Sequence, residues 1–125
     1  MTIIGIFLLA ALLGLSIFQL ILIAGKPLGE YAWGGQHKVL PNNLRRGSIF
    51  SLVIYALMAL VFIDKSGFAD TFLPDRFVSV AMWVITGYFA LGIVMNGISR
   101  SKKERNLWTP IVIVLSVLSF LLARG

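Results

Sequence analysis

The residues best suited to chemistry lie in one polar stretch, 25–46, of a chain of 125 residues that is otherwise largely apolar. Paired glycines allow backbone conformations whose amides can bind an anion, and basic side chains follow closely in the sequence. The stretch therefore predicts a site for a small anion or a phosphate-bearing lipid head group. Its candidate residues are Trp33, Gly34, Gly35, Gln36, His37, Lys38, Arg45 and Arg46.

Catalysis has weaker support in the same stretch. His37, the only histidine, has the right chemistry for a general base, but only Glu30 is a carboxylate near enough in sequence to orient it. The glycines are not followed by the Gly-Lys-Ser/Thr ending of a nucleotide-binding loop. The chain has no cysteine, which excludes thiolate nucleophiles and zinc-thiolate or iron-sulfur ligation. We therefore predict no catalytic residue, no metal ligand and no cofactor, which leaves an enzyme the less favoured class.

A second interpretation of the stretch is a turn that lies in the lipid head-group zone. Pro27 and Pro41 interrupt helical structure at its two ends, because a residue before proline is biased away from the helical region. Between them, apolar residues alternate with glycines and Glu30. Trp33 is suited to anchor such a segment at a membrane interface.

The composition as a whole is that of a membrane protein. Hydrophobic residues make up 58% of the chain and charged residues 13%, with a mean hydropathy of +0.93, whereas soluble domains carry about 25% charged residues. The length allows a single domain, 1–125. The net charge of +6 comes from basic residues in short loops, so we predict no nucleic-acid partner.

Four apolar segments predict four membrane-spanning helices, at about 3–24, 47–63, 76–98 and 107–123. A helix needs about 20 residues to cross the hydrocarbon layer and satisfies its own backbone hydrogen bonds. The expected fold is an all-α, polytopic up-down bundle of four transmembrane helices. Asn42 or Asn43 is expected to cap the second helix, which should stop near Gly67. Pro74 and Asp75 should open the third, and Thr109 should cap the fourth with Pro110 at its first position.

The basic residues predict the orientation of these spans. Loops 25–48 and 99–106 carry eight of the eleven Lys and Arg residues, and the opposite side carries only Lys65, Arg76 and Arg124. Short loops rich in Lys and Arg stay in the cytoplasm. We therefore expect both loops to be cytoplasmic and both termini to lie outside, in a multi-pass membrane protein.

Polar residues within the spans predict how the helices associate. Small residues and interhelical hydrogen bonds drive helix packing in lipid, and the candidates for such contacts are Ser16, Gln19, Ser51, Tyr55 and Asn96. The alternative is that these side chains line a path for a solute. Transporters usually carry an ionisable group at mid-membrane, and no span has one there, which favours the packing role.

The motif G-x-P-x-G-x-x-x-W-G-G, formed by Gly25, Pro27, Gly29, Trp33, Gly34 and Gly35, is followed by Leu40-Pro41 and Leu44-Arg45. Asn96, Ser99-Arg100-Ser101 and Glu104-Arg105-x-Leu107-Trp108 extend the pattern. On these residues the chain resembles small four-span bacterial membrane proteins to which no activity is assigned. The resemblance implies an inner-membrane location and the four-helix layout, and it implies no substrate or catalytic residue.

Three functions follow as hypotheses. The first is a non-catalytic membrane protein that binds lipid, foremost an anionic phospholipid, or a partner protein through loop 25–48. The second is a transporter or channel for a small solute or lipid that acts as a homo-oligomer. The third is a membrane enzyme on a lipophilic substrate, similar in outline to the trimeric glutathione-dependent four-helix enzymes. The Arg, Asn and Glu motif of that family is not reproduced by Asn43-Leu44-Arg45-Arg46.

Overall fold

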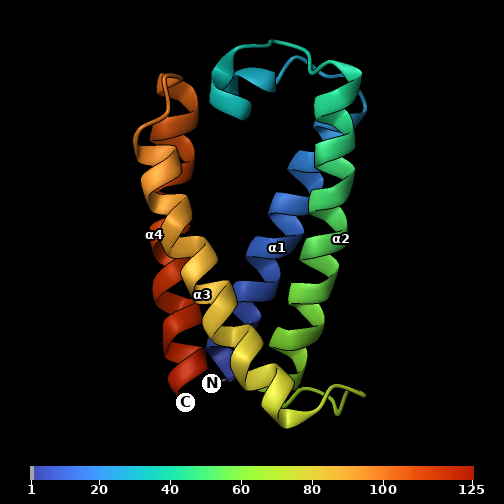
Figure 1. The fold of residues 1–125 in the computed structure, drawn as a ribbon, viewed down its shortest axis with the longest axis vertical. Coiled ribbons are helices and arrows are strands. Elements are labelled where there is room, and N and C mark those ends of the chain that lie inside the picture. Colours follow the sequence, from blue (N-terminus) through green and yellow to red (C-terminus); the bar gives the residue numbers. More distant parts are fainter. Residues whose placement is uncertain (1) are drawn as a thin grey trace.

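Four runs of apolar residues form the four long helices of the chain. The structure, a computed structural model, describes residues 2–125 and contains α1 (Thr2–Ile23), α2 (Asn42–Lys65), α3 (Asp75–Gly97) and α4 (Lys102–Arg124) (Figure 1). Consecutive helices run antiparallel, and residues 2–125 contain no strand. Each of the four helices is long and apolar enough to cross a membrane. The all-α up-down bundle is therefore confirmed.

The helices associate as two pairs. α1 packs mainly on α2 and α3 mainly on α4, with fewer contacts between the pairs. Both termini and the connection 66–74 lie at one end, here called the terminal end, where the pairs converge (Figure 1). The pairs separate toward the opposite end, here called the loop end, which carries the connections 24–41 and 98–101.

The position of the core explains this shape. The main hydrophobic cluster contains a fully buried side chain from each helix, namely Leu8, Phe62, Met82 and Leu122, and each of these four lies in the half of its helix nearer the terminal end. Large apolar side chains fill the space between the pairs there and hold them together. The loop half has fewer such residues, so the space between the pairs is not closed by side-chain packing.

The starts of α2 and α4 differ from the predictions. Pro41 is the N-cap residue of α2 and no side chain caps this end, so the predicted cap at Asn42 or Asn43 is wrong. α4 begins at Lys102, and its N-cap is Ser101, whose Oγ accepts a hydrogen bond from the Glu104 N–H at 3.1 Å. The predicted cap at Thr109 is therefore also wrong, and Pro110 lies inside the helix.

Two other helix boundaries agree with the predictions. α2 ends at Lys65, and Gly67 follows with φ of +78°, the left-handed conformation typical of a residue just beyond a helix. Pro74 is the N-cap residue of α3 and Asp75 its first residue. The carboxylate of Asp75 there suits the positive end of the helix dipole.

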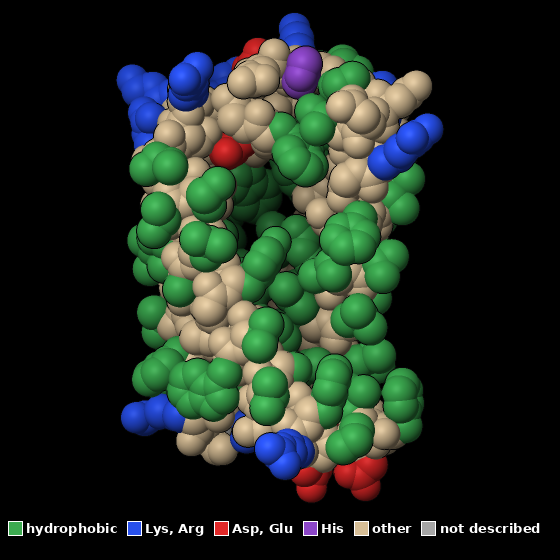
Figure 2. All heavy atoms as spheres, viewed as in Figure 1, with side chains coloured by type: hydrophobic (Ala, Val, Ile, Leu, Met, Phe, Trp, Pro, Cys, Tyr) green, Lys and Arg blue, Asp and Glu red, His purple; other side chains and the backbone are tan. Residues whose placement is uncertain are grey.

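Charged side chains are separated between the two ends (Figure 2). Eight of the eleven Lys and Arg residues lie at the loop end, in or next to the connections and in the first turns of α2 and α4. The terminal end carries Lys65, Arg76 and Arg124 together with three of the five acidic residues, Asp64, Asp70 and Asp75. The loop end is therefore strongly cationic, and the terminal end is close to neutral.

Candidate functional site

Residues 29–36, here called the cap segment, lie across the loop end between the two helix pairs (Figure 1). The segment consists of two short 3-10 turns, Gly29–Tyr31 and Trp33–Gly35. The Gly29 N–H donates to the Lys38 carbonyl at 2.8 Å. This bond ties the start of the cap segment to the residues that follow it in the loop. A polar loop is thus folded over the open end of the bundle.

Three hydrogen bonds dock the cap segment on the start of α4. The Gly34 N–H donates to Glu104 Oε2 at 3.1 Å, and the Trp108 Nε1–H donates to the Tyr31 carbonyl at 2.7 Å. The Ser101 hydroxyl donates to the Glu30 carbonyl. Glu104 is buried, so its carboxylate needs a donor, and the Gly34 amide provides one.

Two glycines allow the cap segment to approach the helices this closely. Gly35 has φ of +75°, and a Cβ there would lie 2.4 Å from Ser101 Cβ. A Cβ at Gly47, in the second turn of α2, would lie 2.8 Å from Cζ2 of the Trp33 ring. The Trp33 ring therefore rests on α2 while Gly35 contacts the residue that caps α4. The cap segment joins the helix pairs where the core does not.

An ion pair between Glu30 and Lys103 adds to this docking. The hydrogen bond and charge of Lys103 hold the pKa of Glu30 below its usual value of 4.5. Both side chains are exposed, so solvent screens their attraction and the pair contributes little to stability. The main attachment of the cap segment is therefore the three hydrogen bonds to the start of α4.

A cavity of about 300 Å³, here called the chamber, lies beneath the cap segment between the helix pairs. Tyr31, Ala32 and Trp33 form its roof, and the surface of this face is hollowed below the loop end (Figure 2). Phe18 and Trp108 pack edge to face in its wall with ring centroids 4.8 Å apart. Side chains that can form hydrogen bonds come from three helices: Gln19, Tyr55, Tyr88 and Asn96.

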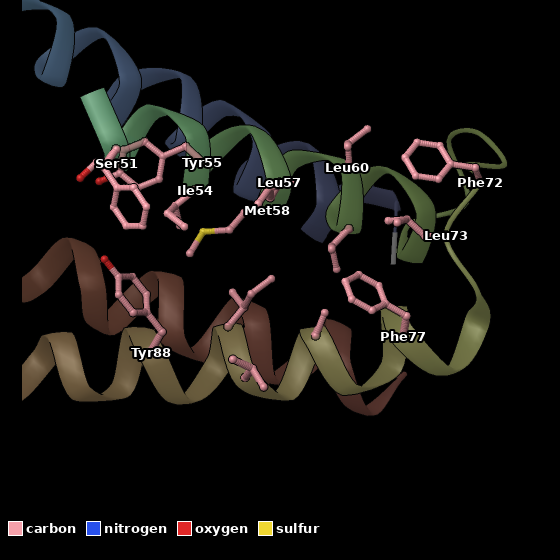
Figure 3. Close-up of a pocket in the computed structure, with 15 residues that line it drawn as sticks. Ser51, Ile54, Tyr55, Leu57, Met58, Leu60, Phe72, Leu73, Phe77 and Tyr88 are labelled. Atoms are coloured by element: carbon pink, nitrogen blue, oxygen red, sulfur yellow. The ribbon is translucent and has the colours of Figure 1, made fainter. Parts of the chain in front are cut away.

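A second cavity of about 500 Å³, here called the groove, continues from the chamber toward the terminal end between α2 and α3 (Figure 3). It is lined almost entirely by apolar side chains, among them Phe50, Met58, Phe72 and Phe77. Its polar lining residues are Ser51, Tyr55 and Tyr88, and the Ser51 hydroxyl already donates to the Gly47 carbonyl at 3.1 Å. Because Tyr55 and Tyr88 border both cavities, the groove and the chamber meet at these two tyrosines.

The predicted anion-binding residues are only partly brought together. Gly34, Gly35 and Gln36 share a shallow pocket of about 380 Å³ at the loop end with Glu30 and the basic residues Arg100, Lys102 and Lys103. Lys38, Arg45 and Arg46 do not line this pocket. The Arg45 Nε–H donates to the Leu40 carbonyl at 2.8 Å, so it holds the exit of the loop. An anion at Gly34 would also have to share its amide with Glu104.

Other predicted residues have clear positions. Trp33 lies in the chamber roof, and His37 is half-buried. Glu30, the only carboxylate near enough in sequence to orient His37, pairs with Lys103. Residues 2–125 contain no group of three or more His, Cys, Asp or Glu side chains that could hold a metal ion.

The predicted intramembrane polar residues divide between the two cavities. Gln19, Tyr55 and Asn96 line the chamber and Ser51 the groove, whereas Ser16 lines neither. The Asn96 Nδ2–H donates to the Gly92 carbonyl of its own helix at 2.8 Å, as Ser51 does within α2. Interhelical hydrogen bonds from these residues stay a prediction.

Glu104 and Trp108, which hold the cap segment, were not among the candidate site residues predicted from the sequence. One signal for Glu104 was available: Ser101-x-x-Glu104 has the spacing that marks a helix start. Trp108 had no comparable signal, because its partner Tyr31 lies 77 residues away in the sequence.

Comparison of the chain with known protein families, curated proteins and solved structures finds no match. The resemblance on the Trp-Gly-Gly motif therefore stays a prediction. The geometry of the cap segment, the chamber and the groove is the basis for a functional assignment.

Proposed function

We propose that the protein is a non-catalytic integral membrane protein that binds a lipid between its two helix pairs. In this proposal all four helices cross the inner membrane of a bacterial cell, with the loop end in the cytoplasm. The length and apolar character of the helices support the insertion. The excess of Lys and Arg at the loop end supports the orientation.

The observation that carries this proposal is the continuity of the chamber and the groove. The groove is apolar and lies on the side of the bundle, between α2 and α3, where a bilayer supplies lipid chains. Its α2 lining runs from Phe50 to Val61, roughly 17 Å of helix at about 1.5 Å per residue. One leaflet of a hydrocarbon layer is about 15 Å deep. A lipid chain therefore fits the groove while its polar end enters the chamber.

Anionic phospholipids are the proposed neighbours of the loop end. Each basic residue near an anionic membrane surface contributes about 1 kcal/mol of attraction, and Arg100, Lys102 and Lys103 surround the shallow pocket beside Gly34. This contact is with the surface of the protein and is separate from the lipid held between the helices.

Native mass spectrometry of the protein released from mild detergent tests lipid binding. Ala81 lines the groove, and Ala81→Trp fills it. Ala90, on the same helix, is exposed and lines neither cavity, so Ala90→Trp is the matched control. We expect retained lipid in the wild type and in Ala90→Trp and its loss in Ala81→Trp. Equal lipid retention in all three proteins would refute the proposal.

Cysteine labelling tests the orientation, because the chain has no cysteine of its own. Gln36 is exposed at the loop end and Asp70 at the terminal end. In intact spheroplasts an impermeant maleimide should label Asp70→Cys, and it should label Gln36→Cys only after the membrane is opened. The reverse pattern would place the cationic end outside.

Solute transport is the second candidate, because Gln19 and Asn96 both line the chamber. The cap segment would have to leave the loop end for a solute to pass. Flux through liposomes that is abolished by Gln19→Leu or Asn96→Leu would favour transport over lipid binding. Absence of flux through a folded, reconstituted sample would exclude it.

A further inference from the structure

We infer that the lipid held in the chamber and groove has an uncharged head that forms hydrogen bonds through hydroxyl or carbonyl oxygens, as in a diacylglycerol, an isoprenoid alcohol or a quinone. This inference rests on the proposed lipid binding and narrows it to one class. It assigns the chamber to the head and the groove to the chain.

The chamber offers neutral donors and acceptors. A tyrosine hydroxyl both donates and accepts, and a glutamine or asparagine amide has donors and an acceptor. Tyr55 and Tyr88 reach the boundary of chamber and groove from α2 and α3 (Figure 3). Gln19 and Asn96 lie nearer the cap segment, toward the C-terminal ends of α1 and α3. Asn96 uses one N–H on the Gly92 carbonyl, which leaves its amide oxygen to accept. A hydroxyl or carbonyl head finds partners at either depth.

Charged groups are absent from this space. Among the described residues, no Lys, Arg, His, Asp or Glu lines the chamber or the groove. Two basic residues of the loop end are engaged elsewhere: Arg45 donates to the Leu40 carbonyl, and Lys103 pairs with Glu30. A phosphate in the chamber would be a charge removed from water without a counter-ion, which is strongly unfavourable.

The depth of the two tyrosines also favours a lipid with an uncharged head. Tyr55 and Tyr88 stand near the middle of α2 (Asn42–Lys65) and α3 (Asp75–Gly97), so in a membrane they lie near its midplane. A charged head must remain at the water interface, because a charge at the bilayer centre is costly. An uncharged head can descend to the tyrosines. Above it, the Tyr31 and Trp33 roof separates the chamber from the loop end.

Two lipids with the same acyl chains test the inference: dioleoylglycerol, which ends in a hydroxyl, and dioleoylphosphatidic acid, which ends in a phosphate. Each is titrated into the full-length protein in nanodiscs, and binding within the cavity is defined as the part that Ala81→Trp removes and Ala90→Trp retains. We expect dioleoylglycerol to bind within the cavity at least about tenfold more tightly than dioleoylphosphatidic acid, because burying the charge of the phosphate is costly. The double variant Tyr55→Phe, Tyr88→Phe should weaken dioleoylglycerol roughly tenfold through two lost hydrogen bonds, with no effect on phosphatidic acid.

The outcomes separate the inference from the proposed function. Phosphatidic acid that binds in the cavity as tightly as dioleoylglycerol would overturn the uncharged head and leave lipid binding standing. If neither lipid is displaced by Ala81→Trp in a protein with unchanged helix content, both proposals fail. A change of oligomeric state in Ala81→Trp, without loss of lipid, would show that a second copy occupies the groove and would also overturn both.

Discussion

Trp108→Phe tests how the cap segment is held. The substitution removes the indole N–H that donates to the Tyr31 carbonyl at 2.7 Å and keeps an aromatic ring to pack on Phe18. A neutral hydrogen bond of this kind contributes about 1 kcal/mol net. The population with an undocked cap segment should therefore rise about fivefold, while the helices, which do not depend on this bond, should be unchanged.

Amide hydrogen exchange measures this effect directly. The Gly29 and Gly35 amides donate within the loop, to the Lys38 and Ala32 carbonyls, and their exchange should accelerate about fivefold. Trp83→Phe is the matched control, because Trp83 is exposed on α3 and packs edge to face on Phe120. Unchanged exchange in the loop, or equal acceleration throughout α4, would refute the idea that Trp108 holds the cap segment.

Three further predictions address the cap segment and the core. Glu104→Ala should lower the free energy of unfolding by about 1 to 3 kcal/mol, because the Gly34 N–H loses its acceptor. Glu104→Gln keeps an acceptor oxygen and should be less destabilised. Thermal unfolding in detergent measures both effects. Phe62→Ala should cost about 3 to 5 kcal/mol at a fully buried position, and the exposed Phe7→Ala should change the unfolding midpoint little. The pKa of Glu30 is held below 4.5, so its ion pair with Lys103 is present above that pH and is lost as the pH falls through the lowered pKa. Amide exchange in the cap segment should therefore rise only in that acid range. The Glu30→Gln variant, which cannot titrate, should show no such rise.

Local patterns in the sequence were sufficient for the helices and insufficient for their polar ends. The uncharged run from Ile3 to Ala24 predicted α1 almost to its last residue. α2 and α4 both extend beyond the predicted spans, to Asn42 and Lys102, because their first turns are polar and carry basic residues. An apolar window stops at such a turn, although the backbone continues as helix.

The chamber could not be predicted from local patterns, because its lining comes from all four helices and the loop at once. Gln19, Tyr55 and Asn96 were identified as polar residues within spans, yet only the separation of the helix pairs places them around one cavity. The docking of the cap segment depends on pairs such as Gly34 and Glu104, 70 residues apart in sequence. Pairings of that range depend on the tertiary fold and leave no periodic signal.

The bond between Tyr31 and Trp108 also sets an order of events during synthesis of the chain. The two residues are 77 positions apart, so at about 5 to 20 residues per second the ribosome adds Trp108 roughly 4 to 15 s after Tyr31. At the start of that interval only α1 has been made, and once α2 is complete at Lys65 the loop between the two helices still has no α4 to dock on. The cap segment can dock on α4 only at the end of that interval, so in the proposed lipid-binding role a lipid can enter from the bilayer before the cap segment covers the chamber.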